Sequence, residues 1–256
     1  MKTAATMAPA GNSSDAFASY LLWTLLALVL AMLVQAPASL LKKALPATLP
    51  VQVQAWGGTL WNGQADWQQG SLQGQLRWQL RPWQLLLGHA SADIDLEGDV
   101  PLKGRLTVGA GGSWSAEDLN GTIPTELLRP VLPAGWDLPG SLRADKLSLS
   151  RAGLHKGNWR AGSGSLHWQG GAMSFDLNGQ PASATLPPVA LGLKLEGDTV
   201  VLGLVEEAGQ LSLAELRAGS DNMLETRVRQ RLLAYSPSYH GQGGPDQIVV
   251  TAKQPL

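Results

Sequence analysis

The sequence predicts an all-β protein: a single N-terminal transmembrane helix, followed by an antiparallel, curled β-sheet domain with a short C-terminal helix. Three observations lead to this prediction. Residues 16–41 contain no charged side chain. Beyond residue 50, apolar and polar residues alternate over many short stretches, as in strands with one buried face. Thirty glycines and sixteen prolines, against 15% charged residues, indicate a chain that turns often.

The apolar segment Phe17–Val34 defines the predicted membrane anchor. At about 1.5 Å per residue, a helix over this segment is roughly 27 Å long, which is enough to cross a bilayer. We therefore expect a cytoplasmic stub at residues 1–15 and a transmembrane helix at residues 16–36. A cleaved signal peptide is the alternative, because "APA" at Ala36–Ala38 resembles a small-residue cleavage site.

The chain after the predicted helix divides into a linker and a folded domain. Residues 37–50 are rich in proline and predict a short, stiff linker. Residues 51–256 predict the antiparallel β domain. Lys42 and Lys43 follow the helix, so a literal count of positive charges would leave this domain in the cytoplasm. Long domains cross the membrane largely regardless of charge, and we expect this domain to lie on the side of the membrane away from the cytoplasm.

The clearest alternation runs from Leu72 to Leu80, where leucine, glycine and tryptophan share one parity. The segment Trp61–Trp67 alternates in the same way, and Gln68–Gly70 would join the two as a hairpin. One parity is apolar from Ala92 to Val108, which predicts two strands folded at residues 97–101. Further short strands are expected in "SLRADKLSLS", "GSGSLHWQG", "MSFDLNG", "ALGLKLEG", "TVVLGLV", "QLSLAEL" and "QIVVTAK".

Helix is expected only in short inserts of the domain. Two of these lie near Glu126–Val131 and near Trp83 ("PWQLLLG"). The short C-terminal helix is expected at residues 220–235, "SDNMLETRVRQRLLAY", where Ser220 or Asp221 can cap the first turn and basic residues occupy later turns.

Tryptophan is frequent between Trp56 and Trp78, where it alternates with glycine. A large ring can cover the space beside a glycine, so core filling is one interpretation. An apolar groove or docking surface is the other, because several of these tryptophans stand beside polar residues. The pattern G-x-L-x-W-Q occurs at Gly74–Gln79 and again at Gly164–Gln169, which hints at two related β-layers.

The sequence contains no recognisable catalytic motif. It has no cysteine, its four histidines show no metal-ligand spacing, and it lacks a nucleophile elbow and a phosphate-binding loop. Asp93, Asp95, Glu97 and Asp99 share one strand face and could attract calcium, but a solvated outer face explains them better. A net charge of −1 gives no electrostatic footprint for nucleic acid. We therefore expect no enzyme, cofactor, metal or nucleic-acid partner.

The segment "LPATLPVQVQAWGGTLWNGQA", followed by a tryptophan-marked strand and "WQLRPWQLLLG", resembles the type II secretion system protein N family of Gram-negative bacteria. The likeness rests on two groups of residues: Gly58, Thr59, Leu60, Trp61 and Gly63, and then Leu76, Trp78, Leu80, Pro82, Leu85 and Gly88. The resemblance marks as candidate binding residues Gly58, Thr59, Leu60, Trp61, Gly63, Trp78 and Pro82.

The resemblance implies an accessory subunit, anchored in the inner membrane, of the apparatus that exports folded periplasmic proteins through an outer-membrane secretin. Phe17–Val34 would enter the membrane, and residues 51–256 would form a periplasmic domain that binds the secretin or the inner-membrane platform. The alternative is an envelope lipid-binding or lipid-transfer module, in which Leu76, Trp78 and Leu80 line an apolar β-groove and meet acyl chains. A general envelope scaffold is a third interpretation.

Overall fold

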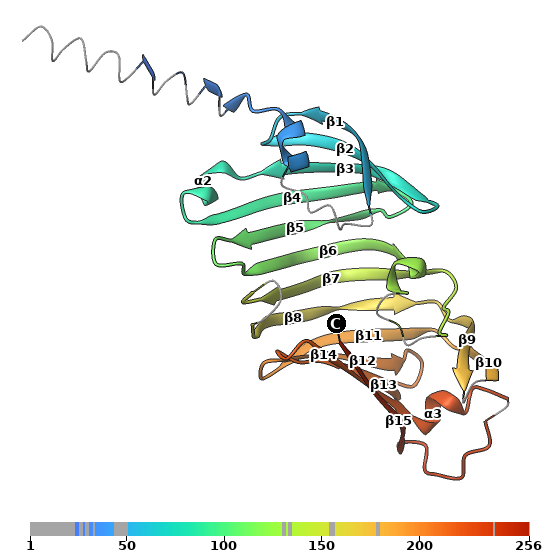
Figure 1. Ribbon diagram of the computed structural model, residues 1–256. Helices are drawn as coiled ribbons and strands as arrows, with labels where there is room; N and C mark the ends of the chain where they lie inside the picture. Colours follow the sequence, from blue (N-terminus) through green and yellow to red (C-terminus); the bar gives the residue numbers. More distant parts are fainter. Residues whose placement is uncertain are drawn as a thin grey trace, which may run out of the picture.

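The computed structural model describes residues 24–25, 28, 31–32, 34–43, 51–129, 132, 135–153, 157–177, 180–237 and 239–255. These residues form one long antiparallel sheet and one small sheet, with short helical turns between strands (Figure 1). The prediction of an all-β, antiparallel domain with little helix is therefore confirmed.

Strands that follow one another in the chain lie beside one another in the long sheet, except that β11 takes the place next to β8. The order across the sheet is β1 (Gln52–Gly58), β2 (Asn62–Gln69), β3 (Leu72–Leu80), β4 (His89–Gly98), β5 (Leu102–Gly109), β6 (Trp114–Pro124), β7 (Ser141–Arg151), β8 (Trp159–Trp168), β11 (Val189–Glu196), β12 (Thr199–Glu206), β13 (Ser212–Ala218), β14 (Met223–Arg229) and β15 (Ile248–Pro255). The small sheet pairs β9 (Gly171–Leu177) with β10 (Gln180–Leu186). The helical turns are η1 (Ala38–Lys43), α2 (Pro82–Leu85), η2 (Thr125–Leu128) and α3 (Gln230–Leu233).

The two hairpins expected from the clearest alternation are confirmed. Gln69 faces Leu72 at the turn between β2 and β3, and Leu96 faces Leu102 at the turn between β4 and β5. Alternate residues of β2 are buried while those between them are exposed. The strand period of two thus sets which side chains enter the core.

The N-terminal predictions fall largely on residues that are not described. The predicted stub at residues 1–15 and most of the predicted transmembrane helix at residues 16–36 lie outside the described residues. Over the described part of the chain, no helix is long and apolar enough to cross a membrane. The described residues of this segment that are helical are Thr24, Leu25, Leu28, Ala31, Met32 and Val34.

The helix predicted at residues 220–235 is wrong for most of its length. Residues 223–229 form β14, which pairs with β13 on one side and β15 on the other, and only the turn α3 is helical. Leu224, Thr226 and Val228 are buried, while the charged residues between them point away from the core. The basic residues that suggested helix turns pair instead with acidic side chains on β13 and β14.

The repeated pattern G-x-L-x-W-Q marks two similar hairpins of one sheet rather than two layers. Trp78 faces Gly63 in the β2–β3 pair, and Trp168 faces Leu142 in the β7–β8 pair. In both, the indole Nε1 donates a hydrogen bond to the carbonyl oxygen three residues before the facing residue. These bonds run from Trp78 to Leu60 at 3.0 Å and from Trp168 to Pro139 at 2.9 Å.

Four of the nine tryptophans beyond residue 50 belong to the core. Trp67, Trp78, Trp159 and Trp168 are buried. The ring of Trp78 fills the space beside Gly63, where an added Cβ would overlap it. Trp83, in contrast, is 58% exposed. Core filling therefore accounts for the buried tryptophans, and Trp83 remains open to another role.

The row of acidic side chains on β4 is neutralised by cations from β3 and β5 and by Arg81, which directly follows β3. The ion pairs, each 2.8 Å long, are Arg81–Asp93, Arg105–Asp93, Lys103–Asp95 and Arg77–Glu97, and the backbone of Gln73 donates to Asp99 at 2.8 Å. Burial raises the pKa of the Asp93 carboxyl, but hydrogen bonds and charge from Arg81 and Arg105 outweigh it and hold the pKa below its ordinary value of 3.8.

We expect Trp78→Ala to lower the free energy of unfolding by about 3–5 kcal/mol, because it empties a buried ring site and leaves the Leu60 carbonyl without its donor. Trp83→Ala is the control and should change stability by no more than about 0.5 kcal/mol. Chemical denaturation of the purified full chain measures both. Equal losses for the two variants would contradict the assignment of Trp78 to the core.

We expect Asp93→Asn to lower stability at neutral pH and to lose this effect in acid. Because the folded pKa of Asp93 is depressed, its carboxylate stabilises the fold above pH 3.8, and this stabilisation disappears as the pH falls through the lower folded pKa. Unfolding free energies of both chains, measured from about pH 7 downward, should converge below pH 3.8. A difference that stays constant with pH would show that the ion pairs do not matter.

Candidate functional site

The family-like motif comes together at the corner between β1 and β2. Gly58 faces Gly63 across the strand pair, with a φ of 78° that favours glycine. A Cβ at Gly58 would lie 2.6 Å from the carbonyl oxygen of Asn62, so no side chain fits there. The backbone nitrogen of Thr59 donates to the same oxygen at 3.0 Å. The motif therefore begins as a tight backbone turn.

This corner holds the segment that follows the predicted anchor. The backbone nitrogen of Leu60 donates to the carbonyl oxygen of Ala36 at 2.7 Å, and Thr59 forms an isolated β-bridge with Pro37. Ala38, at the start of η1, is only 1% exposed and packs with Ala65 and Trp78. The described part of the predicted linker, residues 37–43, is thus fastened to the sheet.

Trp78 supports the corner from β3. Its ring stands edge-on against Trp56 with 6.0 Å between ring centroids, and its Nε1 holds the Leu60 carbonyl. Leu80, at the end of the same strand, donates its backbone N–H to the carbonyl oxygen of Trp61 at 2.7 Å. Pro82 lies outside the corner, at the first turn of α2. Six of the seven candidate residues therefore act together, through backbone bonds and packing.

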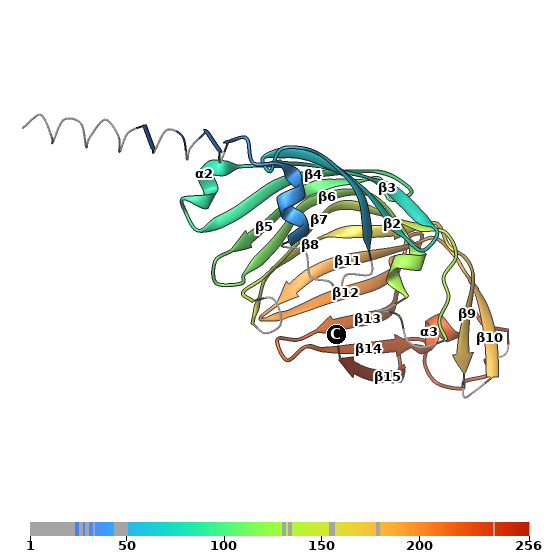
Figure 2. The ribbon, with the colours of Figure 1, turned by 45° about the horizontal axis from the view of Figure 1, so that its top comes forward.

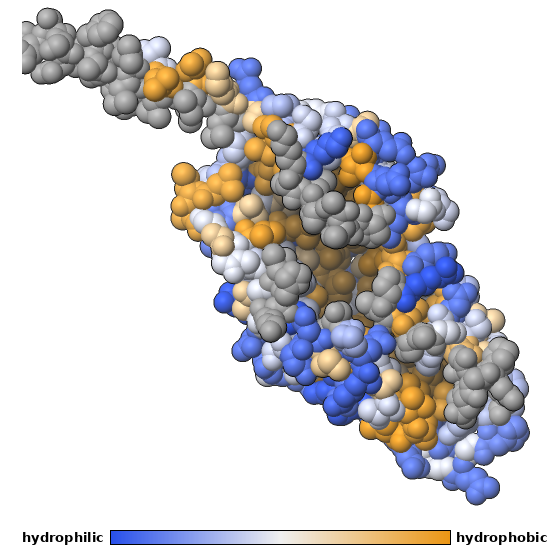
Figure 3. All heavy atoms as spheres, in the orientation of Figure 1, coloured by the Kyte–Doolittle hydropathy of each residue, from blue (hydrophilic) through white to orange (hydrophobic). Residues whose placement is uncertain are grey.

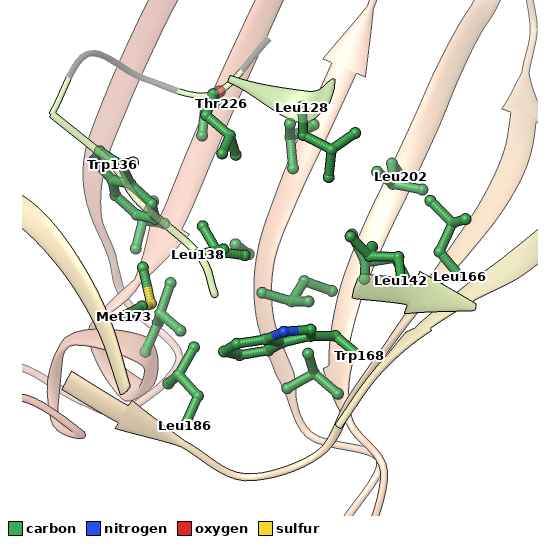
Figure 4. A pocket seen from close by; sticks show the side chains of 18 residues that line it. Leu128, Trp136, Leu138, Leu142, Leu166, Trp168, Met173, Leu186, Leu202 and Thr226 are labelled. Atoms are coloured by element: carbon green, nitrogen blue, oxygen red, sulfur yellow. The ribbon is translucent and has the colours of Figure 1, made fainter. Parts of the chain in front are cut away.

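A second candidate site is an apolar cavity in the C-terminal half of the sheet. It has a volume of about 150 Å³ and lies between the sheet, the β9–β10 hairpin and the segment around Trp136 (Figure 4). On the sheet its lining comes from alternate residues of β7, β8 and β11–β14. The full lining is Leu128, Leu132, Trp136, Leu138, Leu142, Leu166, Trp168, Met173, Leu186, Val189, Leu191, Leu202, Leu204, Ala214, Leu216, Thr226, Val228 and Leu232.

The chemistry of this cavity favours a hydrocarbon guest. Among the described lining residues, Thr226 is the one whose side chain has a hydroxyl, and the indole N–H of Trp168 is already bonded to Pro139. An apolar cavity of about this volume excludes water and can accept a benzene-sized group. Figure 3 shows the same face of the sheet hollowed and lined by hydrophobic residues. The site can therefore take part of an alkyl chain, and it offers nothing to a charged ligand.

The groove residues expected from the sequence lie elsewhere. Leu76, Trp78 and Leu80 belong to the small core beneath η1 and do not line the cavity. A sequence pattern does mark two of the cavity residues, because the second copy of G-x-L-x-W-Q supplies Leu166 and Trp168. The cover over them could not be inferred, since it comes from separate segments.

A polar cluster on β8 resembles a nucleophile–base pair. Ser165 Oγ lies 2.9 Å from His167 Nε2, and His167 Nδ1 lies 2.7 Å from Glu207 Oε1. A carboxylate and a hydroxyl on opposite sides of the ring orient a histidine, but acyl transfer also needs hydrogen-bond donors for the developing oxyanion. Ser165 faces Asp145 on β7 and Gly192 on β11, so its backbone belongs to the ladder on both sides. The cluster therefore lacks the backbone donors of a hydrolase site.

Metal-binding geometry is absent from the described part of the chain. Among those residues, no group of three or more histidine, aspartate or glutamate side chains is placed to hold an ion. The acidic residues of β4 are instead committed to the ion pairs described above.

Comparison with known proteins gives one family. Residues 50–234 match the family model of "Type II secretion system (T2SS), protein N". The chain is also similar to "Type II secretion system protein N" of Aeromonas hydrophila, with 32% identity over 146 residues. That alignment covers 54% of this chain and 57% of the relative, so the chain spans little more than half of that protein. No solved structure matches the chain significantly.

The matched region begins two residues before β1 and ends one residue after α3, so it contains both the corner motif and the cavity. Since this region is well over half of the sequence, the chain belongs to the type II secretion system protein N family.

Proposed function

We propose that this protein is an accessory subunit of the type II secretion system that aids export of folded periplasmic proteins through the outer membrane. Membership of the protein N family supports this role. In this proposal residues 16–36 anchor the chain in the inner membrane as a single span and residues 51–256 stand in the periplasm. The uncharged sequence of residues 16–41 supports the anchor. The protein acts by binding the secretin or the inner-membrane platform, without turnover.

The observation that carries a binding role is the position of β15 as the last strand of the long sheet. Among the described residues, β15 is hydrogen-bonded to β14 on one side only. Two apolar side chains on it, Ile248 and Val250, are exposed. An open edge with apolar side chains is a template for an added strand, and many peptide-binding domains use such an edge. We therefore place the contact with another secretion subunit on β15.

The first test is deletion of the gene in its host, followed by assay of folded exoproteins in the periplasm and the medium. We expect exoproteins to accumulate in the periplasm while the outer membrane remains impermeable to a hydrophobic dye. Complementation with Val250→Asp should fail, because a charge on an edge strand prevents strand addition. Val108→Asp is the matched control: this valine is also exposed, but its strand, β5, is paired on both sides.

Two results would count against this proposal. Normal secretion with a leaky outer membrane would favour lipid handling instead. Full complementation by Val250→Asp, with export restored, would remove β15 as the binding edge. Thermal melts of both purified variants establish that they are folded.

The apolar cavity favours a second candidate function, an envelope lipid-binding or lipid-transfer module. In this alternative the sheet curls so that its apolar face lines a groove, and part of an acyl chain occupies the cavity lined by Leu166, Trp168 and Leu204. The absence of charged side chains from the lining supports a hydrocarbon guest.

If the cavity holds lipid, native mass spectrometry of the purified full chain should detect co-purified phospholipid. Ala214→Leu should abolish that signal, because Ala214 lines the cavity and a larger side chain would fill it. Ala116→Leu is the control, since Ala116 is equally buried but lies outside the cavity. Lipid-free wild-type protein, or lipid retained by a folded Ala214→Leu chain, would exclude this function.

A further inference from the structure

The turn between β3 and β4 presents an apolar tip to solvent. Trp83, Leu85, Leu86 and Leu87 are all exposed, and Leu86 is 89% exposed. No residue of α2 is buried, and residues 82–88 contain no charge. In Figure 3 this turn forms a hydrophobic projection at the left of the molecule. A group of this kind, separate from the core, marks a contact surface.

The tip lies at the end of the sheet where the N-terminal segment reaches the domain. η1 packs on β1 and β2, and the preceding residues are bonded to the β1–β2 corner through Leu60 and Ala36. In both ribbon views α2 projects from the same side of the domain as the N-terminal segment (Figures 1 and 2). In the sequence, the apolar stretch Phe17–Val34 ends two residues before Ala36.

From this arrangement we infer that Trp83, Leu85, Leu86 and Leu87 insert into the interfacial layer of the same bilayer that the N-terminal segment enters. The inference rests on the proposed membrane anchor. The anchor would bring its bilayer to the side of the domain from which the tip projects. A partner protein would need no such position, whereas an interfacial contact requires it.

The composition of the tip suits the membrane interface. Tryptophan is enriched at the boundary between headgroups and acyl chains, and leucine contributes apolar area without polar atoms. The uncharged glutamine within the turn can remain at headgroup level. Lys42, exposed on η1, follows the proposed anchor closely in the sequence, and anionic headgroups attract a positive charge in such a position.

The backbone of the tip is also prepared for an apolar environment. Gln84, Leu87 and Gly88 donate their N–H groups to carbonyl oxygens within the turn at 3.0–3.1 Å, and Ala110 donates to Gly88 at 2.9 Å. Unpaired backbone groups would resist entry into lipid, and these bonds satisfy several of them beforehand. The base of the turn is fixed by the ion pair between Arg81 and Asp93. The tip is therefore held in its exposed form.

The experiment uses the absence of cysteine from the chain. Single cysteines are introduced into the full chain at Leu86→Cys, at Leu28→Cys in the anchor and at Ile248→Cys on the distal edge strand. Each is labelled with an environment-sensitive fluorophore, and the chains are reconstituted into phospholipid vesicles that contain doxyl-labelled lipid. We expect the probes at positions 86 and 28 to be blue-shifted and to lose most of their emission by quenching, while the probe at 248 remains in water.

The outcomes separate this inference from the proposal on which it rests. Quenching at position 28, with water-like emission at 86, overturns the contact of the tip and leaves the anchor intact. Water-like emission at both positions overturns the anchor and the tip together. A blue shift at 86 without quenching by the labelled lipid also overturns the inference, since it means that protein rather than lipid covers the tip.

Discussion

A β-sheet with one apolar face must cover that face, and the structure depends on how this single requirement is met. Thirteen strands lie in one sheet, and the only other sheet among the described residues has two strands. The cover is therefore assembled from small pieces. η1 lies over the first strands, and the β9–β10 hairpin and the segment around Trp136 lie over the last ones. The result is two separate cores, with Leu106 and Val108 exposed between them. A cavity remains under the second cover.

The two covers are attached by the same device. Trp78 and Trp168 each stand on the second strand of a hairpin and bond to a carbonyl just before the first strand. In one case this fixes the corner that receives residues 36–43, and in the other it fixes the end of the segment that closes the cavity. A large ring with one N–H group can do both, because it fills the space beneath the cover and holds the cover by its polar edge. The repeated sequence pattern therefore marks the two places where a covering segment is attached to the sheet.

The sequence predicted those elements whose pattern allowed one interpretation. From Leu72 to Leu80 and again from Ala92 to Val108 the alternation is unbroken, and the strands and turns of these two stretches were placed correctly. β14 was missed because Leu224, Val228 and Leu232 also follow a helical spacing, while Thr226, buried with them, counts as polar. The cavity was beyond sequence reasoning because its lining joins strands to segments far away in the chain. The motif residues were identified from the family likeness, yet their contacts are mainly with the chain's own N-terminal segment.

The strand order sets the distance between the two ends of the long sheet. Neighbouring strands are about 4.8 Å apart, so thirteen of them place β15 roughly 58 Å from β1 along the sheet. One end carries the N-terminal segment, and at the other end β15 pairs, among the described residues, with β14 alone. Since each strand is hydrogen-bonded to the next, the length of the sheet is fixed. A molecule bound at β15 is therefore held at a set distance from whatever holds the N-terminal segment beside β1.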